Sequence, residues 1–184
     1  MEKKFQEETL VFIRKAIRTY ITSGQIVELP DHAPYNEMGA SFVSLHIKSN
    51  HELRGCIGSL QAHRALGKDL IHNALSAAMK DPRFTPLTIS ELDDIELEVS
   101  LLSDPKPFIY ETVEDLLTLL RPHEDGVIIE YEGKSATFLP SVWEQVPDPA
   151  QFLAHLCLKA GFEANFFLSC KLNVRLYSCE IFSE

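Results

Sequence analysis

Hydrophobic residues recur at helical spacing in two parts of the first half of the chain. Residues 5–22 place Leu10, Ile13 and Ile17 on one side of a predicted amphipathic helix, which ends at Ser23-Gly24. Residues 66–78 repeat the pattern. This second helix must end near Asp81-Pro82, because proline disfavours helical geometry in the residue before it.

Alternating hydrophobic and polar residues predict strands elsewhere. The clearest strand is 95–101, where Ile, Leu, Val and Leu alternate with Glu, Glu and Ser. Two pairs of neighbouring runs predict β-hairpins. A final run predicts one strand at the end of the chain, although its alternation slips at Leu176-Tyr177. The predicted hairpins are 40–48 with 52–58 and 127–131 with 135–139, and the final strand is 172–181.

Capping residues mark two shorter helices. Thr112 is a typical N-cap for a helix that runs to about Leu120. Asp148 and Pro149 have the residue types preferred at an N-cap and in the first turn, and Gly161 ends the second of these helices.

These elements predict an α+β fold. Hairpins require antiparallel pairing, and the chain has no glycine-rich phosphate-binding loop of the kind found in nucleotide-binding α/β folds. No linker is long enough to separate two independent domains, so residues 1–184 are predicted to be a single domain.

Composition narrows the class of function. A net charge of −10 disfavours binding to the phosphate backbone of nucleic acids. No apolar run approaches the roughly 20 residues that cross a bilayer, and the charged start lacks the apolar stretch of a signal peptide. We therefore expect a cytoplasmic protein without nucleic-acid or membrane partners.

The four cysteines show no spacing typical of a metal or redox site. His155 and Cys157 are two residues apart on a predicted helix, so their side chains point in nearly opposite directions and do not share an ion. One exposed imidazole and one buried thiol are expected. The sequence predicts neither a metal site nor a cofactor.

The first predicted hairpin, 40–48 with 52–58, places several polar residues on one face and is the best candidate for a functional site. With a three-residue loop at 49–51, Ile47 would lie opposite Leu53, Leu45 opposite Gly55, and Val43 opposite Ile57, which makes one face apolar. The other face would then carry His46 opposite Arg54 and Ser44 opposite Cys56.

This face allows two interpretations of Cys56, as a nucleophilic thiol or as a buried one. Positive charge near a thiol stabilises the thiolate, so Arg54 and His46 would favour a nucleophilic Cys56. Gly55 and Gly58 would let a ligand or partner backbone approach closely. The alternative is a helix-covered face with a buried Cys56, in which Glu96 or Glu98 satisfies Arg54 and the glycines mark only a bulge.

The segment Leu53-Arg54-Gly55-Cys56-Ile57-Gly58 resembles the signature hexapeptide of the AMME chromosomal region gene 1 protein family, whose bacterial and archaeal members are called AmmeMemoRadiSam system protein A. The resemblance covers nearly the whole chain. It continues through Asp81-Pro82-Arg83-Phe84, Pro86-Leu87, 98–103, 125–128, 136–140, Val142-Trp143 and 152–161.

The resemblance implies an α+β fold with an antiparallel sheet flanked by helices, a smaller lobe and a cleft near the hexapeptide. It draws Asp81 and Arg83 into the candidate site, with a salt-bridged turn as the alternative. Phe138 and Pro140 would line a pocket or end a strand, and Trp143 would be core or pocket wall. Memo-like and radical-SAM proteins are implied as partners, and a small molecule in the cleft is a further candidate. No reaction is implied.

Two classes of function follow. The first is a binding or accessory protein whose working surface surrounds the hexapeptide, with Arg54, Gly55, Ile57, Gly58, Arg83, Phe138 and Pro140 as candidate binding residues. The second is an enzyme or enzyme subunit in which Cys56 is nucleophile or thiol carrier, Arg54 holds an anion, and His46 or Asp81 moves protons. The first is favoured, because no complete catalytic set is present.

Overall fold

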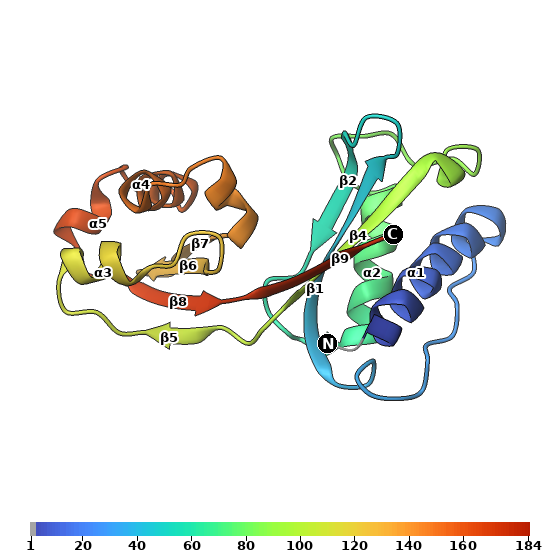
Figure 1. The fold of residues 1–184 in the computed structure, drawn as a ribbon, viewed down its shortest axis with the longest axis horizontal. Helices are drawn as coiled ribbons and strands as arrows, with labels where there is room; N and C mark the ends of the chain where they lie inside the picture. The colour runs from blue at the N-terminus through green and yellow to red at the C-terminus, as the bar shows by residue number, and fades with distance from the viewer. Residues whose placement is uncertain (1–2) are drawn as a thin grey trace. The chain divides into compact units, whose positions relative to one another are not determined.

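The computed structural model describes residues 3–184, which divide into two compact units. Unit 1 takes the chain up to Leu102 together with Glu180–Glu184, and unit 2 spans Ser103–Cys179. Each unit combines an antiparallel sheet with helices (Figure 1), so the predicted α+β class is confirmed. A single domain across 1–184 stays a prediction, because compactness does not establish whether a unit folds alone.

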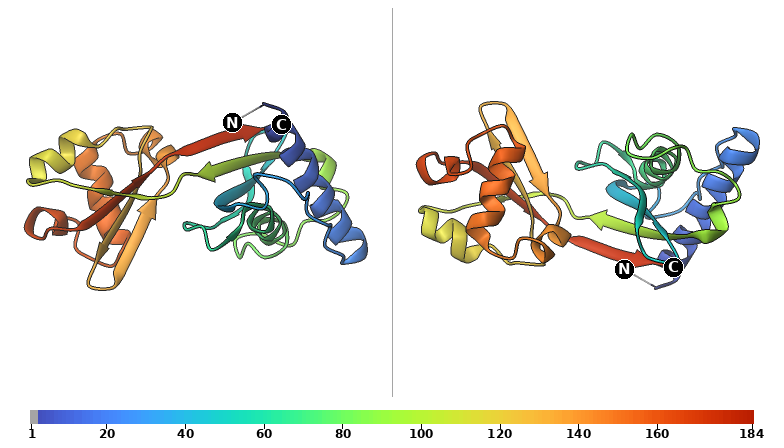
Figure 2. Two further views of the ribbon diagram at one scale, coloured as in Figure 1. Left: turned by 90° about the horizontal axis from the view of Figure 1, so that it is seen from below. Right: turned by 90° about the horizontal axis from the view of Figure 1, so that it is seen from above.

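Unit 1 is a sheet with two long helices on one face. The strand order is β2-β1-β4-β9, and the short β3 also pairs with β1. Helix α1 packs against α2 and β4, while α2 packs against β1 and β2. The views in Figure 2 show β9 beside β4, which returns the end of the chain to this sheet. The elements are α1 Lys3–Ser23, β1 Met38–Ile47, β2 Leu53–Gly58, β3 Arg64–Ala65, α2 Leu66–Met79, the 3₁₀ turn Leu92–Asp94, β4 Ile95–Leu102 and β9 Cys179–Ser183.

Strand alternation determines which face of this sheet is buried. Val43 and Leu45 of β1 and Leu97 and Val99 of β4 are fully buried and share one core with the apolar sides of α1 and α2. The intervening residues of both strands point to the opposite face, because successive side chains alternate. We call this second surface the outer face.

Unit 2 has its own four-stranded antiparallel sheet and its own core. The strand order is β5-β8-β6-β7. The Trp143 and Phe152 rings stack at 3.7 Å in the core, and both are fully buried. The elements are β5 Lys106–Phe108, α3 Val113–Leu119, β6 Gly126–Tyr131, β7 Lys134–Phe138, the 3₁₀ turn Pro140–Glu144, α4 Pro149–Lys159, α5 Phe166–Ser169 and β8 Asn173–Tyr177.

The predicted caps of unit 2 are confirmed. Thr112 caps α3 and forms a reciprocal capping box with Asp115. The Asp148 carboxylate accepts the Gln151 amide at 2.8 Å at the start of α4. Caps of this kind stabilise a helix by about 1 kcal/mol.

The single strand predicted at 172–181 is wrong. The chain breaks at Ser178 into β8 and β9, which belong to the sheets of different units. The slip of alternation at Leu176-Tyr177 lies just before this break. Tyr177 is buried, and its hydroxyl pairs with that of Thr137 at 3.0 Å inside unit 2.

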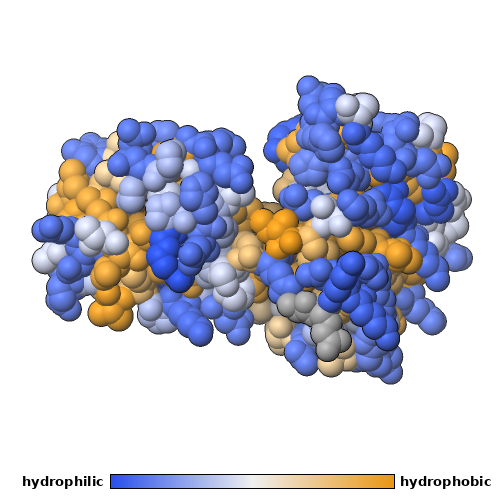
Figure 3. Space-filling view, viewed as in Figure 1, coloured by the Kyte–Doolittle hydropathy of each residue, from blue (hydrophilic) through white to orange (hydrophobic). Residues whose placement is uncertain are grey.

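Hydrophilic residues dominate the surface in Figure 3, and hydrophobic areas interrupt them on each unit. Several large apolar side chains are exposed, including Ile26 in unit 1 and Ile109 in unit 2. Among residues 3–184, no helix is both long and apolar enough to cross a membrane.

Candidate functional site

The hexapeptide forms β2, an edge strand of the unit 1 sheet. The predicted pairs Val43 with Ile57, Ser44 with Cys56, and Leu45 with Gly55 are confirmed. The predicted pairs nearer the loop are wrong. His46 lies opposite Leu53 instead of Arg54, because the register shifts after Leu45.

A β-bulge causes this shift. Arg54 is the extra residue of β2 between the pairs of Leu53 and Gly55. The Ile47 amide donates to the Glu52 carbonyl at 2.9 Å, so Ile47 does not face Leu53. The loop therefore spans 48–51, one residue more than predicted. His51 adopts a left-handed φ of 58° in it.

The two glycines of β2 have packing reasons. A Cβ on Gly55 would lie 2.3 Å from the carbonyl oxygen of Ala77 in α2, and a Cβ on Gly58 would lie 2.1 Å from the Phe42 ring. The space expected for a ligand is thus filled by the chain itself. Ile57 also packs on the unit 1 core.

Cys56 is half-buried on the outer face. The Ser44 hydroxyl donates to the Cys56 sulfur at 3.2 Å. The backbone amide of Cys56 donates to the Asp81 carboxylate at 2.9 Å. The amide points away from β1, so Ser44 and Cys56 form a non-hydrogen-bonded pair, in which side chains approach closely. The sulfur is therefore not sealed in the helix-covered core.

Asp81 and Arg83 brace the free edge of β2. Two Arg83 nitrogens reach the Asp81 carboxylate at 2.7 and 3.0 Å, and the Arg83 guanidinium also donates to the Cys56 carbonyl at 3.3 Å. These hydrogen bonds from Arg83 are the main cause that holds the pKa of the Asp81 carboxyl well below its usual range, although burial opposes them. The salt-bridged turn predicted as an alternative is present, and it contacts the hexapeptide.

Arg54 is buried and paired. Its Nε and Nη2 both reach one carboxylate oxygen of Glu91 at 3.0 Å, and its guanidinium lies 5.8 Å from the centre of the Phe84 ring. The expectation that Glu96 or Glu98 would satisfy it is wrong, because the bulge redirects this side chain. Arg54 Nη1 is buried without a hydrogen-bond partner.

His46 lies on the outer face beside a hollow of about 230 Å³. Its Nδ1 is 3.3 Å from the His51 carbonyl, and its Nε2 is buried without a partner. His51 in turn contacts Glu96 at 3.2 Å. Glu98 and Ser183 complete the lining of the hollow.

The remaining predicted site residues belong to unit 2. Phe138 ends β7 and packs edge-on to Phe152 at 5.3 Å, while Pro140 is buried at the start of a 3₁₀ turn. The alternative that Phe138 ends a strand is thus correct. Trp143 is core, and its indole N–H donates to the Asp125 carbonyl at 2.7 Å.

His155 is exposed and Cys157 is buried, as predicted. Burial raises the pKa of the Cys157 thiol. In the part of the chain that the structure describes, no group of three or more His, Cys, Asp or Glu is placed to hold a metal ion.

Sequence reasoning missed Glu91 and Phe84 as neighbours of Arg54. Glu91 had a visible signal, because Thr88 and Glu91 have the spacing of a capping box, and the Glu91 carboxylate accepts the Thr88 amide at 2.8 Å. That pattern predicts a local turn. It says nothing about an arginine 37 positions earlier.

The fold and site define an α+β protein in which a cysteine-bearing edge strand is bulged and braced by an Asp-Arg turn. A family model described as AMMECR1 matches residues 10–182, and the chain belongs to this family. Two blocks of the resemblance, the hexapeptide and Asp81-Pro82-Arg83-Phe84, meet in this brace.

Archaeal relatives match along most of their length. A protein of Methanothermobacter thermautotrophicus is 38% identical over 180 residues, which cover 96% of this chain and 93% of the relative. A protein of Methanocaldococcus jannaschii is 36% identical over 174 residues, covering 94% and 87%. The crystal structure of an uncharacterised protein from Pyrococcus horikoshii superposes with a TM-score of 0.87 at 31% identity, covering 100% of this chain and 93% of that chain. It has the same α+β fold.

Proposed function

We propose that the chain is a cytoplasmic binding or accessory protein whose working surface is the bulged hairpin of β1 and β2, acting with Memo-like and radical-SAM proteins. One observation carries this proposal. Among the described residues, the buried side-chain nitrogens without a partner are His46 Nε2 and Arg54 Nη1, and both residues adjoin the bulge. A buried, unpaired polar atom is costly, and bulges are frequent beside functional sites. The chain itself covers both nitrogens, so a partner would offset that cost by shifting the covering side chains and offering an acceptor to each nitrogen.

The geometry favours binding over acid–base chemistry. The Asp81 carboxylate is held ionised by Arg83, so it is poorly suited to take up a proton at neutral pH. Glu91 already compensates the charge of Arg54. Asp81 and Arg54, the acid and the cation of the predicted catalytic set, therefore serve to position β2. The net charge of −10 favours protein partners over nucleic acids.

Arg54→Lys tests this proposal. Lysine keeps a positive charge beside Glu91, but it has no atom equivalent to Arg54 Nη1, the nitrogen without a partner. Titration calorimetry would measure binding to the Memo-like and the radical-SAM protein of the same organism. We expect Arg54→Lys to weaken binding by roughly tenfold or more, the effect of one charge-assisted hydrogen bond.

Arg18→Lys is the matched control, because Arg18 forms an exposed ion pair with Asp93 in the same unit. It should bind like the original chain. Cys56→Ser should also retain binding. Unchanged affinity of Arg54→Lys, or no binding by the original chain to either partner, would rule the proposal out.

A second candidate is thiol chemistry at Cys56. It is favoured by the half-buried sulfur on the outer face and by the Ser44 hydroxyl that donates to it, which fixes the direction of the sulfur. Alkylation by iodoacetamide, followed by mass spectrometry between pH 5 and 10, would compare Cys56 with the half-buried Cys170. Under this candidate, Cys56 reacts faster than Cys170 and Ser44→Ala slows it. Equal rates would exclude it.

A further inference from the structure

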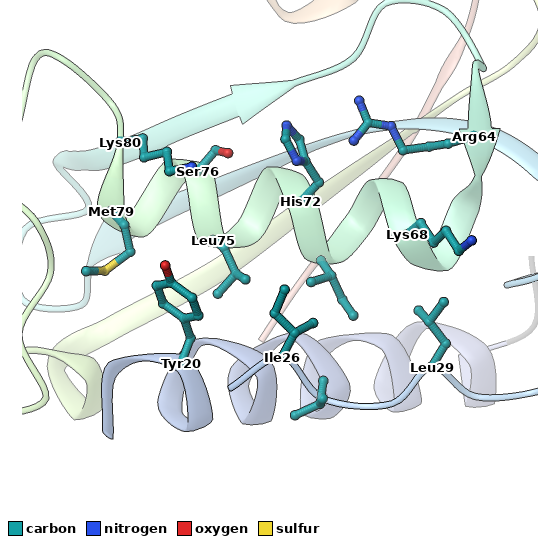
Figure 4. Close-up of a pocket in the computed structure, with 12 residues that line it drawn as sticks. Tyr20, Ile26, Leu29, Arg64, Lys68, His72, Leu75, Ser76, Met79 and Lys80 are labelled. Carbon is teal, nitrogen blue, oxygen red and sulfur yellow. The ribbon is translucent and has the colours of Figure 1, made fainter. Parts of the chain in front are cut away.

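A groove in unit 1 lies between α2 and the segment that follows α1. It has a volume of about 540 Å³. Figure 4 shows Leu75 pointing from α2 toward Tyr20 and Ile26. Ile26 is 65% exposed, although it is a large apolar residue. The apolar lining includes Tyr20, Ile26, Leu29, Ile71, Leu75 and Met79.

A row of polar residues borders this apolar lining. Residues 64, 68, 72, 76 and 80 are Arg, Lys, His, Ser and Lys, and all five line the groove. Lys68, His72 and Ser76 are four residues apart and lie on one side of α2. Arg64 in β3 and Lys80, just after the helix, extend the row at its two ends. No aspartate or glutamate is among the lining residues. This is unexpected in a chain with 27 acidic and 17 basic residues.

The positive charges of this row are largely available. Within residues 3–184, neither Lys68 nor Lys80 has a carboxylate at ion-pair distance, and both are exposed. Arg64 lies 3.4 Å from Asp69, whose carboxylate is buried and already accepts hydrogen bonds from Ser41 and Ser59. The groove therefore combines an apolar lining with two lysines that have no carboxylate partner among residues 3–184.

We propose that this groove binds a small amphipathic anion, an aliphatic molecule that carries a phosphate or carboxylate group. The apolar body lies against Ile26, Leu75 and Met79, and the anionic group pairs with Lys68 or Lys80. The volume lies within the range of about 300–1,000 Å³ that is usual for small-molecule sites. Complementary charge and apolar area together select this class of ligand. The site is separate from the hexapeptide surface.

Titration calorimetry with dodecyl phosphate, kept below its micelle concentration, tests the proposal. We expect one molecule to bind per chain. Dodecyltrimethylammonium has the same chain with the opposite charge, and it should bind at least tenfold more weakly. Inorganic phosphate should bind much more weakly than dodecyl phosphate, because it has no apolar part.

Two groove variants and one control locate the site. Lys68→Glu with Lys80→Glu, and separately Ile26→Asp, should each weaken dodecyl phosphate binding by about tenfold or more. All three residues are exposed, so these changes spare the core. Lys4→Glu with Lys15→Glu is the matched control, because these exposed lysines of α1 lie outside the groove and the double change alters net charge by the same amount as the double lysine variant.

Some results would overturn the inference. Equal affinity for the cationic and anionic probes would remove the role of the basic row. Undiminished binding by both groove variants would place the ligand elsewhere. Binding to phosphatidylglycerol vesicles without binding to monomeric dodecyl phosphate would identify a membrane surface as the ligand.

Discussion

Gly55→Ala is expected to destabilise unit 1, because β2 and α2 touch at this glycine. The added Cβ would lie 2.3 Å from the Ala77 carbonyl oxygen, whereas ordinary contact begins at 3.4 Å. The strand and helix must separate by about 1.1 Å, the difference between these distances. The contacted atom is helix backbone and cannot rotate away. Overpacking costs about 1–3 kcal/mol, and we expect the upper end of that range.

Thermal unfolding followed by circular dichroism measures this loss. About 3 kcal/mol corresponds to a fall in Tm of roughly 6–12 °C for a chain of this size. Hydrogen exchange should also quicken in β2 and α2. Gly24→Ala is the comparison, because Gly24 has a φ of 71° with open space around it, so only backbone strain of about 1 kcal/mol is added. If Gly55→Ala costs no more than Gly24→Ala, packing does not explain this glycine.

Three carboxylates give further predictions. The pKa of Asp81 is lowered in the folded chain, so its contribution to stability is complete above the unfolded pKa of about 3.9 and is lost as pH falls through the folded pKa. Urea unfolding between pH 7 and 2 should therefore show a flatter acid dependence for Asp81→Asn, and parallel curves would contradict this. Asp69 is fully buried and accepts hydrogen bonds from Ser41 and Asn73. Asp69→Ala should lower the free energy of unfolding by about 3–5 kcal/mol in denaturant unfolding, because these donors lose their acceptor. A loss under about 1 kcal/mol would count against a stabilising role of these hydrogen bonds. Asp148→Ala removes the N-cap of α4 and should lower the free energy of unfolding by about 1 kcal/mol. The fluorescence of Trp143, which stacks on Phe152 of α4, would report this unfolding. No change in stability would mean that the cap contributes nothing.

Periodicity was sufficient to predict most of the secondary structure. The helices near 5–22 and 66–78, the strand at 95–101 and both hairpins are present, because each has one apolar face that must be buried. The break in the final strand was not predicted. Its cause is the division of the sheets between two units, and alternation records only burial, not which sheet a strand joins.

The candidate site was predictable only in part. Alternation correctly paired Ser44 with Cys56, since a one-residue slip there would expose the apolar face. It failed beyond Leu45, because an unpaired residue in β2 leaves no mark on hydrophobic spacing. The partners of Arg54 and Cys56, Glu91 and Asp81, are separated from them by 37 and 25 positions, and only the folded chain brings them together.

The brace on β2 limits how a partner recognises this strand. An edge strand usually offers free amides and carbonyls to which another strand can pair. At Cys56 the amide already donates to Asp81 and the carbonyl already accepts from Arg83, so an added strand has no main-chain group to bind there. Recognition at Cys56 must then use side chains, of which the sulfur and the neighbouring Ser44 lie on the outer face. The same hydrogen bonds that block strand addition fix the backbone of β2 at Cys56, next to the bulge at Arg54 where we place the partner.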